Sequence, residues 1–157
     1  MGAEEKAKEL GIEFPDNAEK AYLNILQEIG ENPERAGLKD TPKRAANAMQ
    51  FLMQGYTMDI DQVINDALFP SLSDEMVIVK DIELYSMCEH HMLPFFGHAH
   101  IGYIPNGTII GLSKLARIAD PFSKRLQVQG RLTTQIAQTL DNATRAVGVM
   151  VLVSAQH

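Results

Sequence analysis

The sequence of 157 residues carries a formal net charge of −6 and contains a single cysteine. This length is enough for one domain with a sizeable core and too short for two full domains. The acidic balance argues against a nucleic-acid-binding surface, and the longest apolar runs fall far short of a membrane span. The lone cysteine, and charged N-terminal residues with no apolar segment behind them, indicate a cytoplasmic protein, with a nuclear location left open.

Residues 1–70 are expected to form an N-terminal helical segment. Apolar residues at helical spacing mark its first helix: Tyr22, Ile25, Leu26 and Ile29, followed by Gly30 as a stop. Thr41 is expected to cap a second helix, with Pro42 in its first turn and Gly55 at its end. A third, short helix is expected over residues 60–68.

Residues 71–157 are expected to form the core of the protein, because the hydrophobic pattern changes to that of strands. The segments typical of strands are 76–79, 82–85, 96–104, 108–110 and 149–153. Pro105-Asn106-Gly107 supplies turn chemistry, so the strand at 108–110 is expected to return as the hairpin partner of the strand at 96–104.

Two helices are expected between these strands. The first spans about 113–120, and the second spans about 131–146 before Gly148 ends it. The second has an apolar face formed by Leu132, Ile136 and Leu140. Strands with helices between them predict an α+β fold, in which an antiparallel sheet has helices packed on one side.

Cys88 and His91 are the strongest candidates for metal ligands. A thiolate and an imidazole three residues apart can reach around one tetrahedral zinc ion, but such a site normally takes more than two protein ligands. The alternative is that Cys88 is a small buried apolar residue. His98 and His100 share one face of an expected strand, where they are either further ligands or solvent-facing residues.

The segment Gly111–Arg117 is the second candidate site. Ser113 lies where a helix is expected to begin, and free backbone N–H groups at a helix start attract anions. Lys114 and Arg117 are three residues apart and are therefore neighbours on that helix. The segment is either a phosphate-binding site or an ordinary amphipathic helix start with solvated basic residues.

Taken in order, these motifs resemble those of GTP cyclohydrolase I. The matching segments are 37–38, 41–46, 86–91, 94–97, 100–106, 111–118 and 125–129. The resemblance is closer to animal-like members than to distant ones. It implies zinc-dependent hydrolytic opening of the imidazole ring of GTP, with release of formate and formation of 7,8-dihydroneopterin triphosphate for folate or tetrahydrobiopterin synthesis.

The resemblance also assigns roles to individual residues. It implies that Cys88 and His91 bind zinc and that His90 and His157 transfer protons beside the metal. The substrate-binding residues that it implies are Ser113, Lys114 and Arg117 for the triphosphate, together with Gln129 and, from a neighbouring subunit, Arg44.

The family's assembly is expected here too. The resemblance implies the tunnelling fold, in which sheets of several subunits join into a barrel, and a homodecamer of two pentamers with active sites between subunits. Animal-like members also bind a feedback regulatory protein, and this partner stays open for the present chain.

Three departures from the family pattern bear on activity. The third zinc ligand of the family is a cysteine two positions beyond the residue that His157 matches. If the sequence is complete, zinc is expected to bind weakly or to need a substitute ligand such as His157 or His90; if it is part of a longer chain, the following residues are expected to complete the site. Gly130 stands where the family has a glutamate that binds guanine, and losing that acceptor is expected to cost about 2–4 kcal/mol of binding. Pro121 interrupts an expected helix, either displacing nearby site residues or forming a tolerated surface kink.

Three functions are therefore compatible with the sequence. The first is an active GTP cyclohydrolase I. The second is a catalytically impaired family member that retains fold and assembly. The third is a related tunnelling-fold enzyme that acts on another purine or pterin.

Overall fold

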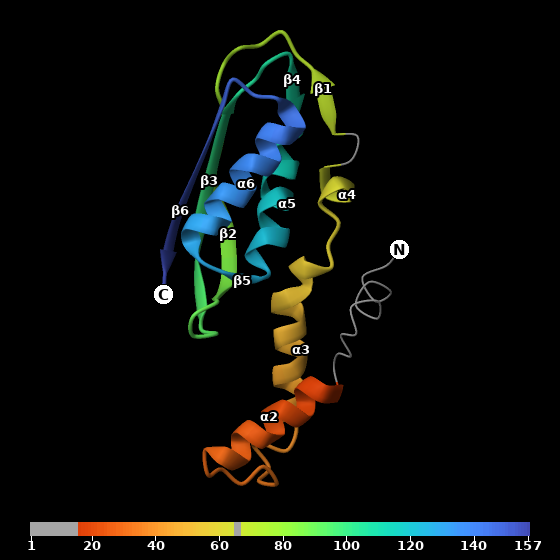
Figure 1. Ribbon diagram of the computed structural model, residues 1–157, viewed down its shortest axis with the longest axis vertical. Coiled ribbons are helices and arrows are strands. Elements are labelled where there is room, and N and C mark those ends of the chain that lie inside the picture. The colour runs from red at the N-terminus through yellow and green to blue at the C-terminus, as the bar shows by residue number, and fades with distance from the viewer. Residues whose placement is uncertain (1–15, 65–66) are drawn as a thin grey trace. The chain divides into compact units, whose positions relative to one another are not determined.

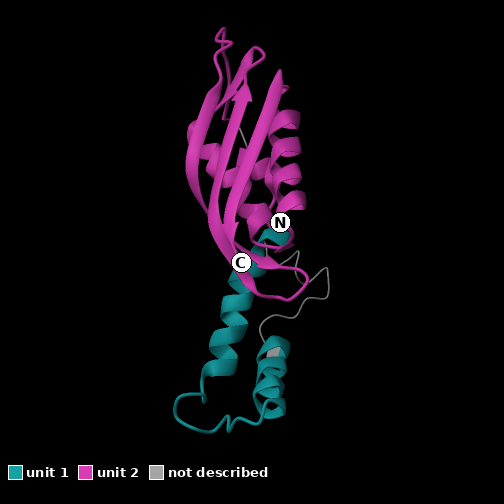
Figure 2. Ribbon diagram, turned by 90° about the vertical axis from the view of Figure 1, so that its left-hand side faces the viewer, with its two compact units in different colours: residues 1–57 teal, residues 58–157 magenta. Residues whose placement is uncertain are grey.

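The computed structural model describes residues 16–64 and 67–157 (Figure 1). The chain forms two compact units, one ending at Thr57 and one beginning at Met58 (Figure 2). Among the described helices, none has the length and apolarity needed to cross a lipid bilayer.

The first unit contains two helices that pack against each other, α2 (Asp16–Glu28) and α3 (Thr41–Met53). Gly30, with φ of +83°, follows α2 as expected for a helix stop. The expected cap of α3 is wrong: Asp40 occupies the N-cap without a side-chain bond, and the Thr41 hydroxyl donates to the Gly37 carbonyl at 3.3 Å. The chain also tightens into a 3₁₀ turn, Gln54–Tyr56, so it does not stop at Gly55.

The second unit contains the remaining elements. In chain order these are α4 (Ile60–Ile64), β1 (Leu68–Pro70), β2 (Val77–Cys88), β3 (Pro94–Ile104), β4 (Thr108–Ile110), α5 (Leu112–Ser123), β5 (Leu126–Gln127), α6 (Gln129–Thr144) and β6 (Gly148–Gln156). The third expected helix is shorter than 60–68: it ends at Ile64, Leu68 is already in a strand, and residues 65–66 lie outside the described part of the chain. The segment 58–70 belongs to this unit because α4 packs on α5 and β1 pairs with β4.

A four-stranded sheet with the order β5-β2-β3-β6 forms the centre of the second unit (Figure 1). Its long strands are antiparallel, as expected, and only the two-residue β5 runs parallel to β2. The two strands expected at 76–79 and 82–85 are one strand, interrupted by a bulge between Val79 and Ile82. At the bulge Asp81 has φ of 57°, and its N–H donates to His100 Nδ1 at 3.2 Å.

The expected hairpin between β3 and β4 is wrong. β4 pairs instead with β1, in a separate two-stranded sheet. The reason is that both edges of β3 are already occupied at that end, by Val77 of β2 opposite Tyr103 and by Gly148 of β6 opposite Ile104.

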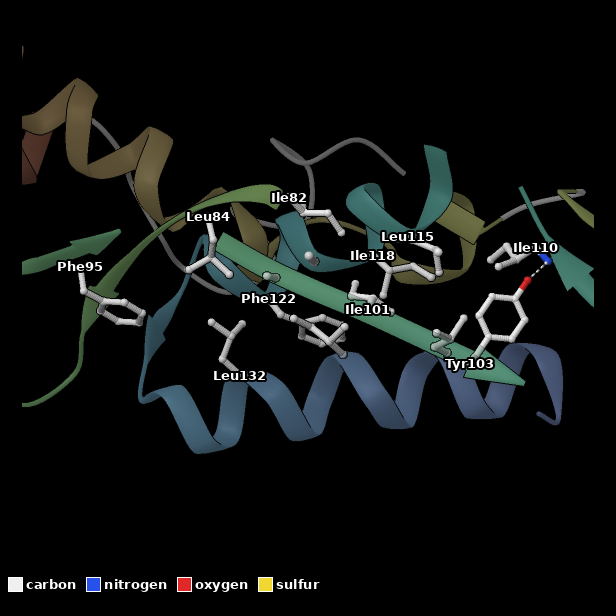
Figure 3. Packing of buried hydrophobic residues seen from close by; sticks show 14 of the residues in the cluster. Ile82, Leu84, Phe95, Ile101, Tyr103, Ile110, Leu115, Ile118, Phe122 and Leu132 are labelled. Atoms are coloured by element: carbon white, nitrogen blue, oxygen red, sulfur yellow. Dashed lines mark hydrogen bonds between the residues drawn. The ribbon is translucent and has the colours of Figure 1, made fainter. Parts of the chain in front are cut away.

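The core lies between this sheet and the helices α5 and α6, which cover one face of it (Figure 3). The expected apolar face of α6 is confirmed, because Leu132, Ile136 and Leu140 are all fully buried. Burying each such side chain stabilises the fold by about 1.5–3 kcal/mol. The helix ends earlier than expected, because Arg145 adopts a left-handed conformation with φ of 52°; Gly148 begins β6.

The opposite face of the sheet is exposed and partly apolar. Its large exposed side chains are Ile78, Tyr85, Phe96, Met150 and Leu152. At Gly97 the strands β3 and β6 approach closely: a Cβ there would collide with the Ser154 carbonyl and lie 2.6 Å from Ala155 Cα. A glycine is therefore required at position 97 of β3, which lies opposite the C-terminal end of β6.

Candidate functional site

A tight loop between β2 and β3 carries the Cys-Glu-His-His motif. The Cys88 N–H donates to the Leu93 carbonyl at 2.8 Å, and the Met92 N–H donates to the Cys88 carbonyl at 2.8 Å. Met92 has φ of 55°, which lets the chain reverse within a few residues. The loop therefore holds His90 and His91 close to the end of β2.

The structure brings Cys88, His91 and His157 together. One potential ligand atom from each lies within 4.8 Å of the other two, and Cys88 Sγ lies 3.7 Å from His91 Nδ1. Cys88 ends β2, whereas His157 directly follows β6, whose Gln156 pairs with Phe96. The antiparallel pairing of β6 with β3 therefore carries His157 to the Cys88 end of the sheet.

The spacing of Cys88 and His91 within this cluster fits a tetrahedral zinc ion. A tetrahedral zinc with sulfur at about 2.3 Å and nitrogen at about 2.0–2.1 Å holds those two ligand atoms about 3.6 Å apart. The distance of 3.7 Å between Cys88 Sγ and His91 Nδ1 matches this value. Within residues 16–64 and 67–157, no other group of three His, Cys, Asp or Glu residues has its potential ligand atoms within 4.8 Å of one another.

Cys88 is buried, as one interpretation expects, and its position stays compatible with the predicted metal ligand. Its side chain is only 3% exposed and belongs to the hydrophobic core, yet its sulfur faces an imidazole. His91 and His157 are exposed, so the cluster lies at the boundary between core and solvent. A ligand set in this position is open on one side to an incoming molecule.

The other histidines lie outside the cluster. His90 is exposed, with its ring 6.2 Å from that of His91 and its Nε2 3.9 Å from a Glu89 carboxylate oxygen. His98 is exposed on β3, and His100 is used by the bulge at Asp81. His90 is thus beside the cluster. His98 is solvent-facing, which was the alternative to metal binding, whereas His100 is half-buried and accepts from the bulge, a role that neither alternative anticipated.

The three residues expected to bind triphosphate occupy the start of α5. Gly111 is the N-cap and makes no side-chain capping bond, and Ser113 and Arg117 are exposed. The half-buried Lys114 donates from Nζ to the Val63 carbonyl at 3.0 Å, in the last turn of α4. The helix start therefore offers cationic and backbone donors to an anion.

This helix start and the metal cluster lie at opposite ends of the second unit (Figure 1). The start of α5 follows β4 and is near Tyr103, whose hydroxyl accepts from the Ile110 N–H at 3.0 Å. The cluster adjoins Pro94, at the other end of β3. About 30 Å of strand separates the two ends, so one nucleotide cannot touch both within a single chain.

Gln129 lies at the cluster end. It begins α6 and is exposed, two residues after Gln127, which pairs with Cys88 across the sheet. Gly130 follows in the first turn of α6, and a Cβ built there meets no atom within 4 Å. The position thus has room for the larger side chain that the family carries.

Pro121 is not the surface kink that was one alternative. It is buried inside α5, which continues to Ser123, and its carbonyl accepts from Arg125 Nε at 3.0 Å. Since proline lacks an N–H, the helical bond to the Arg117 carbonyl is missing. The helix absorbs this loss in its last turn, and Arg117 stays on the same helix as Ser113 and Lys114.

Arg44 lies in α3, in the first unit. It is exposed, and its guanidinium lies 3.8 Å from the Asp40 carboxylate. Its expected contribution to the triphosphate site of a neighbouring subunit stays a prediction.

Sequence reasoning missed the contacts of Glu89. Its carboxylate pairs with Arg131 of α6, and its N–H donates to the Gln127 carbonyl at 3.0 Å. Because 42 residues separate Glu89 from Arg131, no local spacing relates them. The one available signal was that Glu89 lies between the two candidate metal ligands.

The fold and the cluster define an α+β protein with a Cys/His group at one end of its sheet that could hold a metal ion. Its likeness to the crystal structure of an archaeosine synthase QueF-Like in the apo form supports the fold alone: the TM-score is 0.50 at 19% identity, over 54% of this chain and 84% of that one. This match agrees with the expected tunnelling fold.

Sequence comparison gives the family. The GTP cyclohydrolase I family matches residues 18–157. GTP cyclohydrolase 1 1 of Pseudomonas syringae pv. tomato is 60% identical over 136 residues, covering 87% of this chain and 73% of the relative. GTP cyclohydrolase 1 of Alkalilimnicola ehrlichii is 57% identical over 142 residues, covering 90% and 77%. The chain therefore belongs to the GTP cyclohydrolase I family, a family of hydrolases. These bacterial relatives do not test the closer resemblance to animal-like members, which stays a prediction.

Proposed function

We propose that this chain hydrolyses the imidazole ring of GTP, releases formate and forms 7,8-dihydroneopterin triphosphate. Relatives named GTP cyclohydrolase 1 that are 57–60% identical over most of the chain support this activity. The observation that carries the proposal is the cluster of Cys88, His91 and His157, with 3.7 Å between the first two ligand atoms.

Zinc is the metal that this donor set fits. A thiolate and imidazoles at tetrahedral spacing are typical zinc ligands. We assign Cys88 and His91 as ligands, with His157 either completing the set or transferring protons beside it. When bound, zinc supplies Lewis-acid activation of water for the hydrolysis.

We assign proton transfer and substrate binding to other side chains of the site. His90 is exposed beside His91, so its imidazole is free to move protons to and from a substrate at the metal. We assign Gln129, which lies at the nearby start of α6, to contact with the substrate's base. Ser113, Lys114 and Arg117 hold the triphosphate, which fixes the substrate far from the reacting carbon and so helps to orient it.

The separation of the cluster from the start of α5 supports a site shared between copies of the chain. Each copy would present its metal end to the phosphate-binding end of a neighbour, with Arg44 contributing from a further copy. We propose a homodecamer of two pentamers, in which the exposed apolar side chains of the sheet line the joined barrel. A feedback regulatory protein, a cytoplasmic location and a role in folate or tetrahydrobiopterin synthesis remain predictions.

An impaired family member is the second candidate, because Gly130 leaves an empty position where the family has a guanine-binding carboxylate. Such a chain would fold, bind metal and assemble, but would turn over GTP slowly. The first experiment therefore measures formate release and the fluorescence of the oxidised pterin product from GTP, with one zinc supplied per chain.

Substitution of the sulfur ligand tests the proposed chemistry directly. Cys88→Ser is expected to abolish zinc binding and formate release while leaving the circular dichroism spectrum unchanged. The matched control is His98→Ala, an exposed histidine of β3 outside the cluster, which should keep both properties. A Cys88→Ser protein that retains zinc and turnover would rule out the ligand assignment.

A further inference from the structure

Glu89 and Arg131 form an ion pair that ties the metal-ligand loop to α6. Glu89 lies directly between Cys88 and His90, and one of its carboxylate oxygens accepts from Arg131 Nη2. Its backbone N–H donates to the Gln127 carbonyl at 3.0 Å. Glu89 is therefore held by both its main chain and its side chain on the α6 side of the loop.

Arg131 makes three different contacts with its planar guanidinium. Besides Glu89, it donates from Nε to Gln127 Oε1 at 3.0 Å and from Nη2 to the Leu126 carbonyl at 2.8 Å. A guanidinium whose N–H groups are hydrogen-bonded to several acceptors has little freedom to move. The guanidinium thus fixes Glu89 relative to β5.

The network ends in the core. Gln127 is only 1% exposed, and its Nε2 donates to the Phe122 carbonyl and to Gln135 Oε1, both at 2.8 Å. The Glu89–Arg131 pair is therefore anchored on a buried amide. The exposed pair Arg35–Glu31, four residues apart in the sequence of the first unit, is by contrast a single contact of 2.9 Å.

We propose that Glu89 and Arg131 are positioning residues that hold the Cys88–His91 loop in its metal-binding geometry before the metal arrives. The inference rests on the proposed metal site. On its β3 side the loop is already held by the bonds between Cys88, Met92 and Leu93; the Glu89–Arg131 pair fixes its other side. Ligands that are ordered in advance lose less conformational entropy when they bind a metal.

The competing explanation is an ordinary surface ion pair. The side chains of Arg131 and Glu89 are 43% and 31% exposed, and pairs with such exposure often contribute little to stability. The two explanations differ in what they affect. A surface pair would change the unfolding temperature slightly and leave metal affinity alone, whereas positioning residues change metal affinity even when the fold is intact.

The test is a titration of the metal-free protein with Co²⁺, followed by the thiolate-to-cobalt absorption band. Glu89→Ala and Arg131→Ala are each expected to weaken Co²⁺ binding about tenfold. The double variant should bind Co²⁺ no more weakly than Arg131→Ala alone, because the Glu89 side chain acts through its contact with Arg131. Glu89→Gln, which keeps an acceptor oxygen for Arg131, should recover part of the loss. Arg35→Ala is the matched control and should bind Co²⁺ as the unchanged protein does.

The outcomes separate this inference from the proposed function. If the unchanged protein shows no thiolate-to-cobalt band, the metal site is wrong and the inference falls with it. If the unchanged protein shows the band and Glu89→Ala binds Co²⁺ equally well, the metal site stands and the positioning role is wrong. Glu89 is a loop residue whose removal leaves the core intact, so this second result is obtainable even if Arg131→Ala fails to fold.

Discussion

Cys88 has two properties that together define its chemistry. Its side chain packs in the core, which fixes the position of the sulfur, while the sulfur faces His91 across 3.7 Å. A buried thiol is normally inert because burial disfavours the thiolate. A bound cation offsets this penalty by pairing with the thiolate charge, so burial does not prevent Cys88 from acting as the metal ligand that we propose.

Gly130 gives the clearest prediction at the scale of a single residue. Gly130→Glu is expected to tighten GTP binding, because the position is open and adjoins Gln129 at the cluster end of the unit. The substitution should also stabilise the protein by about 1 kcal/mol, since glycine disfavours a helix. Isothermal titration with GTP and thermal unfolding measure the two effects separately.

Gly130→Ala is the control for this prediction. It removes the same helix-disfavouring glycine without adding a carboxylate, so it should raise the unfolding temperature and leave GTP affinity unchanged. If Gly130→Glu improves stability to the same degree but leaves GTP affinity unmoved, the missing carboxylate does not explain guanine recognition in this chain.

At the scale of elements, the pairing of β3 with β6 decides where His157 lies. Gly97 lets the two strands approach, because any Cβ there would collide with the Ser154 carbonyl. Gly97→Ala is therefore expected to push β6 away near its C-terminal end, and so to displace His157 from the cluster. Co²⁺ affinity should fall together with the unfolding temperature.

Gly102 provides a matched control on the same strand. A Cβ at Gly102 would lie 3.6 Å from Ile78 Cγ1, which is ordinary van der Waals contact. Gly102→Ala should therefore retain both metal affinity and stability. Unchanged Co²⁺ binding in Gly97→Ala would show that the end of β6 does not contribute to the cluster.

Elements with long, regular patterns could be predicted from the sequence, and short ones could not. The apolar spacing of Leu132, Ile136 and Leu140 predicted α6 and its buried face, because a helix of this length repeats its signal several times. β4 has three residues, too few to indicate a partner, and its pairing with β1 depends on β3 being occupied on both sides.

The candidate site likewise contains some features that the sequence could predict and others that it could not. The spacing of Cys88 and His91 in the sequence predicted that their side chains lie within reach of one ion, and the distance of 3.7 Å between them agrees. The approach of His157 depends on the register of β6, and the contact of Glu89 with Arg131 depends on how α6 begins. Contacts between residues that are distant in the sequence leave no local sequence pattern, so only the three-dimensional structure reveals them.

At the scale of the whole molecule, the distance between cluster and α5 predicts complementation between defective copies. Cys88→Ser and Lys114→Ala should each be inactive alone. When the two chains are co-expressed and mix at random, about one quarter of the sites receive an intact copy of both ends. Formate release should return to a comparable fraction of normal activity.

The control for this experiment combines two defects at the same end. Co-expressed Cys88→Ser and His91→Ala should stay inactive, because both residues belong to one loop and no mixed site has both intact. Failure of the first mixture to regain activity, with both chains present in the same oligomer, would show that Cys88 and Lys114 serve one site within a single chain.

Because the pairing of β6 brings His157 to the cluster, metal binding is expected to be coupled to the folding of this strand. His157 follows β6, an edge strand of the four-stranded sheet, whereas Cys88 ends the inner strand β2 and His91 lies in the loop after it. A metal shared by them acts as a removable cross-link that only the folded chain can form, because the three ligands come together only when β6 pairs with β3. At a free metal concentration one hundred times its dissociation constant, such a cross-link adds about 2.7 kcal/mol to the free energy of unfolding. Chelation should therefore release the last strand first, seen as faster amide exchange in β6 while α6 remains protected.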